Sequence, residues 1–381
     1  MPEMRRILLA CLIAAFLLGA FSLSAMAAPS APLCLPDTYA PTARDCLPYG
    51  PSAYLSDMQD LGMGFPQAEL PSIEPDSSLT YLPYRYARVL NQPGPVFATI
   101  EDASEGKVVK RWIEAGFDYV TYIDVREFDG KDYYMIAPGE WMRRADLSVG
   151  VAYAQFMGLE FKATPAHKFG WMLQATQISV APGADPEANA TWLNRWDVIQ
   201  VYDEREIADL KYYLIGPNQW IESRTAALVY PNAQAPDGVE NGRWIEINLH
   251  EQTLAVYDES GLVYATLVST GVAGFWTRPG LFQVYEKLET TPMTGAFEAD
   301  RSDYYYLEDV PWTMYFDEAR ALHGAYWHTK FGYEQSHGCA NLSSGDSQWL
   351  YNWAELGDWV YVWDPSGRTP TDPSLYGAGG A

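Results

Sequence analysis

The sequence predicts a mainly β protein in which two small β-barrel-like repeats precede a β-rich C-terminal domain with one short helix. Three observations support this prediction. From about Tyr81 onward, apolar residues come in short runs with strand-like alternation. One of these segments then recurs further along the chain. After residue 242 the alternation resumes, and helical spacing interrupts it at residues 343–355.

The recurring segment is residues 118–146, which align without a gap to residues 197–225, a displacement of 79 positions. Each copy reads as strand, turn, strand with a Tyr-Tyr pair, proline-containing turn and tryptophan strand. We therefore predict one repeat at residues 81–150 and a second at 151–230, with residues 151–173 counted in the second. The matching residues are Asp124/Asp203, Arg126/Arg205, Glu127/Glu206, Tyr133/Tyr212, Tyr134/Tyr213, Pro138/Pro217 and Trp141/Trp220.

Residues 1–27 are typical of a signal peptide. Arg5 and Arg6 form a basic start, residues 7–20 form an apolar run, and Ala25 and Ala27 flank a small-x-small cleavage site. A single membrane span is the rival interpretation, but the apolar run is short and ends in small residues. We expect an exported mature protein without a membrane span.

Residues 28–80 are predicted to form an extended, proline-rich leader. The leader contains Cys34 and Cys46, which remain once Cys11 has left with the signal peptide and Cys339 is set aside as a reactive thiol. In an oxidising compartment we expect the two to form a disulfide, and closing so short a loop contributes roughly 2–3 kcal/mol.

The charge distribution excludes one large class of function. The formal net charge is −24, and 19% of the residues are charged. Binding to nucleic acid requires clustered lysines and arginines that neutralise phosphates, and no such cluster is present in the sequence. The same acidity argues against tight electrostatic docking on anionic lipid.

The C-terminal domain is expected at residues 243–364, after a Pro/Gly/Asn-rich linker at 231–242 and before a flexible tail at 365–381. A helix is predicted at residues 343–355, capped by Ser343 or Ser344, with Leu350, Trp353 and Ala354 facing inward. The predicted strands are residues 244–249, 252–257, 262–269, 282–288, 310–316 and 359–363.

Residues 323–341 concentrate the groups that carry chemistry. This stretch holds three of the five histidines and the one cysteine of the C-terminal half, in the order His323, His328, His337 and Cys339. A nearby imidazole allows a thiol to act as a nucleophile and carries the proton to the leaving group. Small neighbours such as Gly338 permit close approach of a substrate. We therefore predict a catalytic thiol at Cys339 and assign His328 to a lid over the site.

The pattern H…SHGC-x-N in this stretch resembles the signature of the L,D-transpeptidase (YkuD-type) catalytic domain of bacterial cell-wall enzymes. The VSTG and T-x-P-G-x-F segments are also similar, so the resemblance covers about residues 243–364. It implies Cys339 as the nucleophile and His323 as the general base, oriented by the Gly324 carbonyl. The other residues that it implies are His337 as a catalytic contact to the oxyanion, and Ser336, Gly338 and Asn341 around the substrate and oxyanion pocket. The repeats resemble bacterial Src-homology-three-like barrels.

The resemblance implies formation of 3→3 peptidoglycan cross-links by acyl transfer from a tetrapeptide stem, with release of D-alanine. The partners would be stem peptides, with glycan strands as a further candidate for the repeats, and the location would be the cell wall, periplasm or exterior. No cofactor and no metal are expected, because one cysteine with two histidines lacks the paired spacing of zinc sites. A hydrolase on the same scaffold and a non-catalytic wall-binding protein remain alternatives. In a papain-like endopeptidase the cysteine would precede its histidine.

Overall fold

The computed structural model describes residues 58–64, 67–232, 234–296 and 300–376. They belong to one unit that begins at Met58. The expected signal peptide and the Cys34–Cys46 disulfide lie outside the described residues. The described end of the leader contains a two-residue strand, β1 (Ser72–Ile73), and a 3-10 turn, η1 (Ser77–Thr80). In the described part of the chain, no helix has the length and apolar character needed to cross a bilayer.

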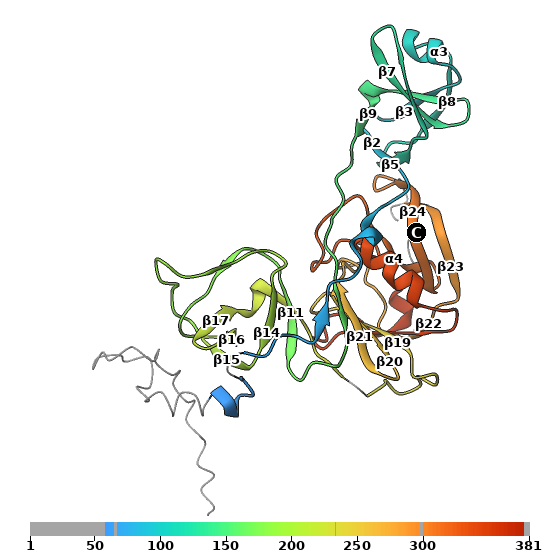
Figure 1. The fold of residues 1–381 in the computed structure, drawn as a ribbon. Helices are drawn as coiled ribbons and strands as arrows, with labels where there is room; N and C mark the ends of the chain where they lie inside the picture. The colour runs from blue at the N-terminus through green and yellow to red at the C-terminus, as the bar shows by residue number, and fades with distance from the viewer. Residues whose placement is uncertain (1–57, 65–66, 233, 297–299, 377–381) are drawn as a thin grey trace, which may run out of the picture. The chain divides into compact units, whose positions relative to one another are not determined.

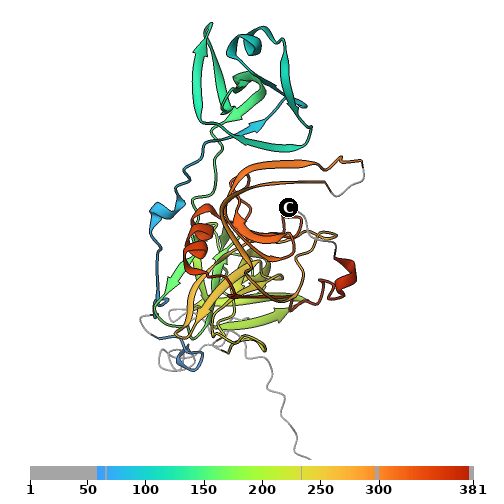
Figure 2. The same cartoon turned by 90° about the vertical axis from the view of Figure 1, so that its right-hand side faces the viewer.

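The first repeat is built from strands that enclose a small apolar core (Figures 1 and 2, blue-green to green). Strand β2 (Tyr86–Val89) lies between β5 (Phe117–Thr121) and β9 (Leu147–Val149). A five-stranded sheet has the order β4 (Val109–Ile113), β3 (Gly94–Phe97), β8 (Glu140–Arg143), β7 (Lys131–Ala137) and β6 (Asp124–Phe128). The core between them is apolar: Ala87, Val89, Val96, Ile113, Val120, Tyr134, Ile136, Met142 and Leu147.

One helix of this repeat was not predicted from the sequence. Helix α3 (Ile100–Glu105) begins after Thr99, whose side chain accepts a hydrogen bond from the Asp102 N–H, and ends at Gly106 in the left-handed conformation. The cap signal, a threonine three residues before an aspartate, was present in the sequence. The helix has only six residues, too few to show a helical period.

The second repeat has the same strand order around β11 (Lys168–Met172), which pairs with β14 (Val198–Val201) and β18 (Ala226–Val229). The next three strands are β15 (Asp203–Ile207), β16 (Leu210–Gly216) and β17 (Gln219–Glu222). A short ribbon, β12 (Thr176–Gln177) with β13 (Trp192–Leu193), is added in this repeat. The core contains Met172, Ile199, Val201, Tyr213, Ile215, Ile221, Ala226 and Leu228.

The 79-residue displacement seen in the sequence recurs in the structure. Strands β6, β7 and β8 begin and end 79 positions before β15, β16 and β17. The hairpin turns also correspond, because Asp129-Gly130 and Ala208-Asp209 all have positive φ, as a type I′ turn requires. The two segments therefore adopt one supersecondary unit.

The segment between the repeats divides differently from the prediction. Strand β10 (Leu159–Phe161) does not join the second repeat: it pairs with β1 on one side and with β21 (Gly261–Leu267) of the C-terminal domain on the other. The reason lies in packing, since Leu159 and Phe161 bury their side chains in a core shared with Ala265 and Leu267. The part of the interval from β11 onward does belong to the second repeat.

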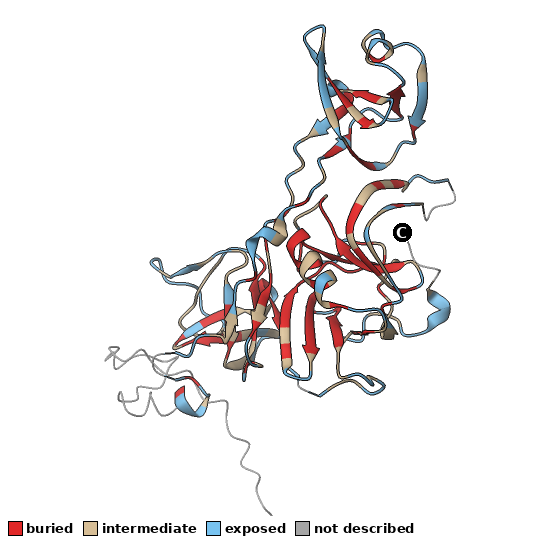
Figure 3. Cartoon of the chain, turned by 45° about the vertical axis from the view of Figure 1, so that its right-hand side comes forward, coloured by how far each residue is buried: buried red, intermediate tan, exposed pale blue. Residues whose placement is uncertain are grey.

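The C-terminal domain contains a seven-stranded sheet in the order β1-β10-β21-β20-β19-β27-β22. Strand β19 (Trp244–Asn248) pairs antiparallel with β20 (Thr253–Asp258) and parallel with β27 (Trp359–Trp363), and β22 (Gly280–Gln283) forms the edge. Successive residues of β19 and β20 face two different apolar cores, so the central strands are buried on both faces (Figure 3, red).

A second sheet carries the strands around the predicted site. Its order is β26 (Ala340–Leu342), β25 (Arg320–Gly324), β24 (Tyr305–Asp317), β5, β2 and β9, and β23 (Glu286–Gly295) pairs with β24. The single strand expected at 282–288 is wrong. The chain leaves β22 at Gln283 and enters β23 at Glu286 in the other sheet, because buried Val284 turns into the core between the sheets.

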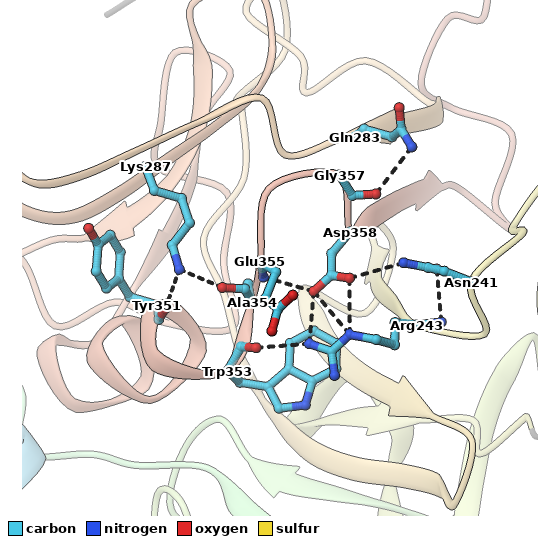
Figure 4. Close-up of polar contacts among 10 residues, drawn as sticks. All are labelled: Asn241, Arg243, Gln283, Lys287, Tyr351, Trp353, Ala354, Glu355, Gly357 and Asp358. Atoms are coloured by element: carbon cyan, nitrogen blue, oxygen red, sulfur yellow. Dashed lines mark hydrogen bonds and ion pairs between the residues drawn. The ribbon is translucent and has the colours of Figure 1, made fainter.

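The predicted helix is α4 (Ser344–Trp353), which confirms the expected segment to within two residues. Ser343 is its cap, with the side-chain oxygen accepting from the Asp346 N–H. Leu350 and Ala354 are buried, and Trp353 is half-buried. At the other end, Lys287 Nζ donates to the carbonyls of Tyr351 and Ala354, so a cation satisfies the last turn (Figure 4).

The turn after α4 is fastened to the end of the predicted linker. Arg243 makes a two-pronged contact with Asp358 and also donates to the Trp353 carbonyl (Figure 4). Asn241 Nδ2 and the Glu355 N–H donate to the same Asp358 carboxylate. These contacts hold β27 beside β19. Taken together, the strands and α4 confirm the predicted fold class, mainly β with a short helix after Cys339.

Candidate active site

Cys339 lies at the end of a tight turn, immediately before β26. The turn is held by Ser336, whose Oγ donates to the Cys339 carbonyl at 2.6 Å and accepts from the Gly338 N–H at 3.1 Å. Thr277 Oγ1 donates to the Gly338 carbonyl at 2.8 Å. Gly338 has φ +124°, a conformation that side chains rarely permit. The glycine of the SHGC motif is thus required by the shape of the turn.

His323 lies on β25, which runs parallel to β26 in the register His323 opposite Asn341. Its Nδ1 is 3.3 Å from the Gly324 carbonyl oxygen, and its ring is buried. A hydrogen bond at this position places the ring proton on Nδ1 and leaves the lone pair on Nε2. Burial lowers the pKa of His323 to about 4, so the ring is neutral at neutral pH and can accept a proton there.

The thiol is also neutral at rest. Burial raises the pKa of Cys339 to about 11, while the Ala321 N–H and the nearby Arg320 act in the opposite direction. The Ala321 N–H is 3.4 Å from Sγ. Since the thiol holds its proton and the imidazole does not, the resting pair is neutral, unlike the thiolate–imidazolium pair of the most strongly activated cysteines.

His337 is held between aromatic rings. It stacks on Tyr305 with ring centroids 6.1 Å apart and meets the edge of Phe275 at 4.8 Å. Burial lowers its pKa, and Asp303 partly offsets that effect. The Gly338 N–H, expected near an oxyanion, is directed at Ser336 Oγ in this structure.

These groups share one cavity of about 410 Å³. Of the residues predicted for the site, Cys339, His323, His337, Ser336 and Asn341 line it, whereas Gly324 and Gly338 act through their backbone. The sequence did not predict the contributions of the hairpin β23–β24 or of the first repeat. The remaining lining residues are Phe117, Met293, Asp303, Tyr305, Leu307, Trp327, His328 and Gln335.

His328 was assigned to a lid, but it is a half-buried part of the wall of this cavity. Its Nδ1 accepts from the Lys330 N–H at 3.2 Å, and its Nε2 is 3.0 Å from the side-chain amide of Asn341. Burial lowers its pKa to about 4. The atom of Asn341 nearest to Nε2 is the amide nitrogen Nδ2, and the tautomer of the ring decides which ring nitrogen accepts. His328 therefore orients Asn341 beside His323.

Beneath the turn is a buried ion cluster that the sequence did not reveal. Asp317 accepts from Arg320 at 3.0 Å and from two nitrogens of Arg278, one of them at 3.0 Å. Arg320 is 4% exposed, and the position of a Cβ on Gly338 would lie 3.2 Å from its Nε. Within the described ranges, no group of three or more His, Cys, Asp or Glu side chains is arranged to hold a metal ion.

Comparison with known families agrees with the sequence motif. Residues 242–362 match the family model of the L,D-transpeptidase catalytic domain, YkuD. This span runs from the end of the linker to β27 and includes His323, the SHGC turn and α4. The resemblance stated from the sequence is therefore confirmed for the C-terminal domain, and the likeness of the repeats to Src-homology-three-like barrels stays a prediction.

Solved structures with partial similarity are also L,D-transpeptidases. The protein from Stackebrandtia nassauensis is 27% identical, with 37% of this chain and 61% of that one covered and a TM-score of 0.27. The catalytic domain from E. faecium is 25% identical, with 33% and 100% covered and a TM-score of 0.30. L,D-transpeptidase 3 from Mycobacterium tuberculosis is 17% identical, with 56% and 93% covered and a TM-score of 0.30. No curated protein matches the chain.

Proposed function

We propose that the protein is a peptidoglycan L,D-transpeptidase, a cysteine acyltransferase that forms 3→3 cross-links from tetrapeptide stems. The observation that carries the proposal is the combination of the family match over residues 242–362 with one cavity lined by Cys339 and His323. The thiol is the nucleophile, and the imidazole is the base.

In the acylation step, the sulfur of Cys339 attacks the peptide carbonyl that precedes the terminal D-alanine. Its proton moves to Nε2 of His323 during the attack, because the neutral resting pair leaves the thiol protonated until substrate arrives. The Gly324 carbonyl keeps the ring oriented. The C–N bond then breaks, the amine of D-alanine takes the proton from His323, and a thioester remains on Cys339.

In the second step, the amine of a neighbouring stem, a diamino acid side chain, attacks the thioester. His323 accepts a proton from that amine, and the thiol is restored when the C–S bond breaks. His337, held between Tyr305 and Phe275, assists the oxyanion in both steps. If water replaces the amine, the same chemistry hydrolyses the stem.

The remaining parts of the proposal follow from the family resemblance. The protein would be exported, would act on the peptidoglycan of the cell wall, and would take stem peptides as substrates. An L,D-transpeptidase has been solved in complex with imipenem. From the family resemblance we expect carbapenems to acylate Cys339.

The test is mass spectrometry of the mature protein incubated with purified disaccharide-tetrapeptide. Wild type is expected to form dimers that lack one D-alanine. Cys339→Ala should form none, and His323→Gln should be slower by about 10²–10⁴-fold because the general base is lost.

His250→Gln, at an exposed histidine outside the cavity, serves as the matched control. Shortened monomers without dimers would indicate that the protein is a hydrolase and not a transferase. Equal dimer formation by wild type and Cys339→Ala would refute the mechanism.

A further inference from the structure

The first repeat is joined to the catalytic domain by main-chain pairing. Strand β5 of the repeat pairs parallel with β24, in the register Phe117 opposite Tyr305 and Tyr119 opposite Leu307. The Phe117 N–H also donates to the Tyr304 carbonyl at 2.9 Å. One sheet therefore runs from β26, beside Cys339, into the repeat.

Side chains reinforce this junction. Thr121 donates through its N–H to Glu308 at 2.7 Å and through its hydroxyl to Asp309 at 2.6 Å. Tyr86 of the repeat stacks on Tyr326, with ring centroids 3.6 Å apart, and Tyr326 precedes the cavity residue Trp327. These polar bonds are specific in direction, so they set the position of the repeat as well as holding it.

The main chains meet where the repeat has a glycine. A Cβ on Gly116 would lie 2.2 Å from the Tyr304 carbonyl oxygen, so any larger residue would separate the strands. The next residue, Phe117, lines the cavity that contains Cys339. Its position thus depends directly on the close approach at Gly116.

Phe117 belongs to an apolar part of the cavity lining. Met293 and Leu307 of the β23–β24 hairpin line the same cavity. The Phe117 ring packs against that of Tyr119, with ring centroids 5.2 Å apart, and lies under the Arg88 guanidinium. Phe117 is nevertheless 39% exposed. An aromatic side chain held half-exposed in a cavity wall is suited to cover apolar parts of a ligand.

We propose that Phe117 is a specificity-determining residue, and that the first repeat completes the substrate cavity. This proposal rests on the proposed function. In it, Phe117, Met293 and Leu307 contact the aliphatic part of the donor stem. The repeat is then part of the enzyme's active site, whatever other role it has toward the wall. The inference concerns binding of the stem, since Phe117 takes no part in proton transfer.

The first measurement is steady-state turnover of the tetrapeptide by Phe117→Ala, Phe117→Leu and wild type. We expect Phe117→Ala to raise KM about tenfold with little change in kcat, because only an apolar binding contact is lost. Phe117→Leu should restore most of the KM. Trp112→Ala removes a ring of the same repeat that is 57% exposed and lies outside this cavity, so it should leave KM unchanged.

A second measurement tests the apolar part of the cavity lining and does not require transpeptidation. The rate of Cys339 modification is compared for N-benzylmaleimide and iodoacetamide, one reagent with an apolar ring and one without, with peptide mapping of the labelled thiol. Phe117→Ala should lower the ratio of the two rates several-fold. Gly116→Val should have the same effect, because it moves the strand that carries Phe117.

The outcomes separate the two proposals. Suppose that the wild type does not react with stems, but Phe117→Ala lowers the ratio of the two modification rates. This result would overturn the proposed function and support Phe117 as an apolar part of the cavity lining. An unchanged rate ratio together with an unchanged KM in Phe117→Ala would refute the proposal that Phe117 is part of the substrate-binding surface. Thermal unfolding of each variant checks that the chain is folded during the measurement.

Discussion

At the scale of residues, the candidate site has a neutral thiol and a neutral imidazole in the wall of one cavity. Both side chains are buried, and burial disfavours the charged form of each. It raises the pKa of Cys339 to about 11 and lowers the pKa of His323 to about 4. In the mechanism that we propose, proton transfer from Cys339 to His323 would then accompany attack on the substrate. A thiol that keeps its proton is oxidised less readily than a thiolate.

This neutral pair predicts the pH dependence of thiol alkylation. Because the pKa of Cys339 is about 11, the thiolate fraction rises about tenfold per pH unit below that value. The rate of Cys339 alkylation by iodoacetamide should therefore climb steadily from pH 6 to pH 10. Mass-spectrometric mapping of the labelled peptide measures it, and Cys339→Ala gives the background. A plateau already reached at pH 7 would instead indicate a preformed thiolate–imidazolium pair.

At the scale of elements, one buried carboxylate joins helix α4 to the sheet next to it. Asp346 is fully buried and accepts from the Gly158 N–H and the Tyr264 hydroxyl, both at 2.7 Å, and from Thr266 Oγ1 at 2.5 Å. Gly158 precedes β10, while Tyr264 and Thr266 lie on β21. Burial raises the pKa of Asp346 to about 6, and the hydrogen bonds it accepts limit that rise.

Removing this carboxylate should loosen the domain. Asp346→Ala leaves three buried donors without their acceptor, and each such loss costs about 1–3 kcal/mol. We expect the free energy of unfolding in urea to fall by at least about 3 kcal/mol. Asp346→Asn, which keeps one acceptor oxygen, should lose less. Asp185→Ala, at an exposed aspartate, is the control. A variant Asp346→Ala as stable as the control would contradict this role.

At the scale of the whole molecule, stability depends on a sheet buried on both faces. Glu246 lies in its central strand, β19, and is 9% exposed. The Trp363 indole N–H donates to its carboxylate at 3.2 Å. Burial raises the pKa of Glu246 from 4.5 to about 7, so the folded protein favours the neutral acid.

The sign of the resulting pH dependence follows from linkage. The folded state holds the Glu246 proton more tightly than the unfolded state does, so this contribution is fully present below about pH 4.5 and is lost as the pH rises through about 7. Glu246→Gln should therefore gain stability relative to wild type between pH 5 and pH 8.5, by about 2–3 kcal/mol. Urea unfolding at both pH values measures the difference. Glu206→Gln, at an exposed site, is the control, and a pH-independent difference would exclude the assignment.

Much of the fold could be predicted because its signals are local. The repeat, the paired strands after residue 244 and the helix after Cys339 each depend on neighbours in sequence. Ser343, one of the two residues expected as the cap, caps that helix. The strand expected at 282–288 failed because its alternation continues while the chain crosses from one sheet to the other at Val284. Local pattern does not record which sheet a strand joins.

For the site, the sequence alone determined that a thiol, an imidazole and a tight glycine turn occur within residues 323–341. Those groups are close along the chain, and the turn restricts which residues can occupy it. Only the tertiary structure decided the rest. It buried the thiol and the ring, paired β25 with β26, brought Arg278 to Asp317 under the turn, and set Phe117 into the cavity. These contacts join residues as far apart as 117 and 339, and they arise from packing of sheets, which no short stretch of sequence encodes.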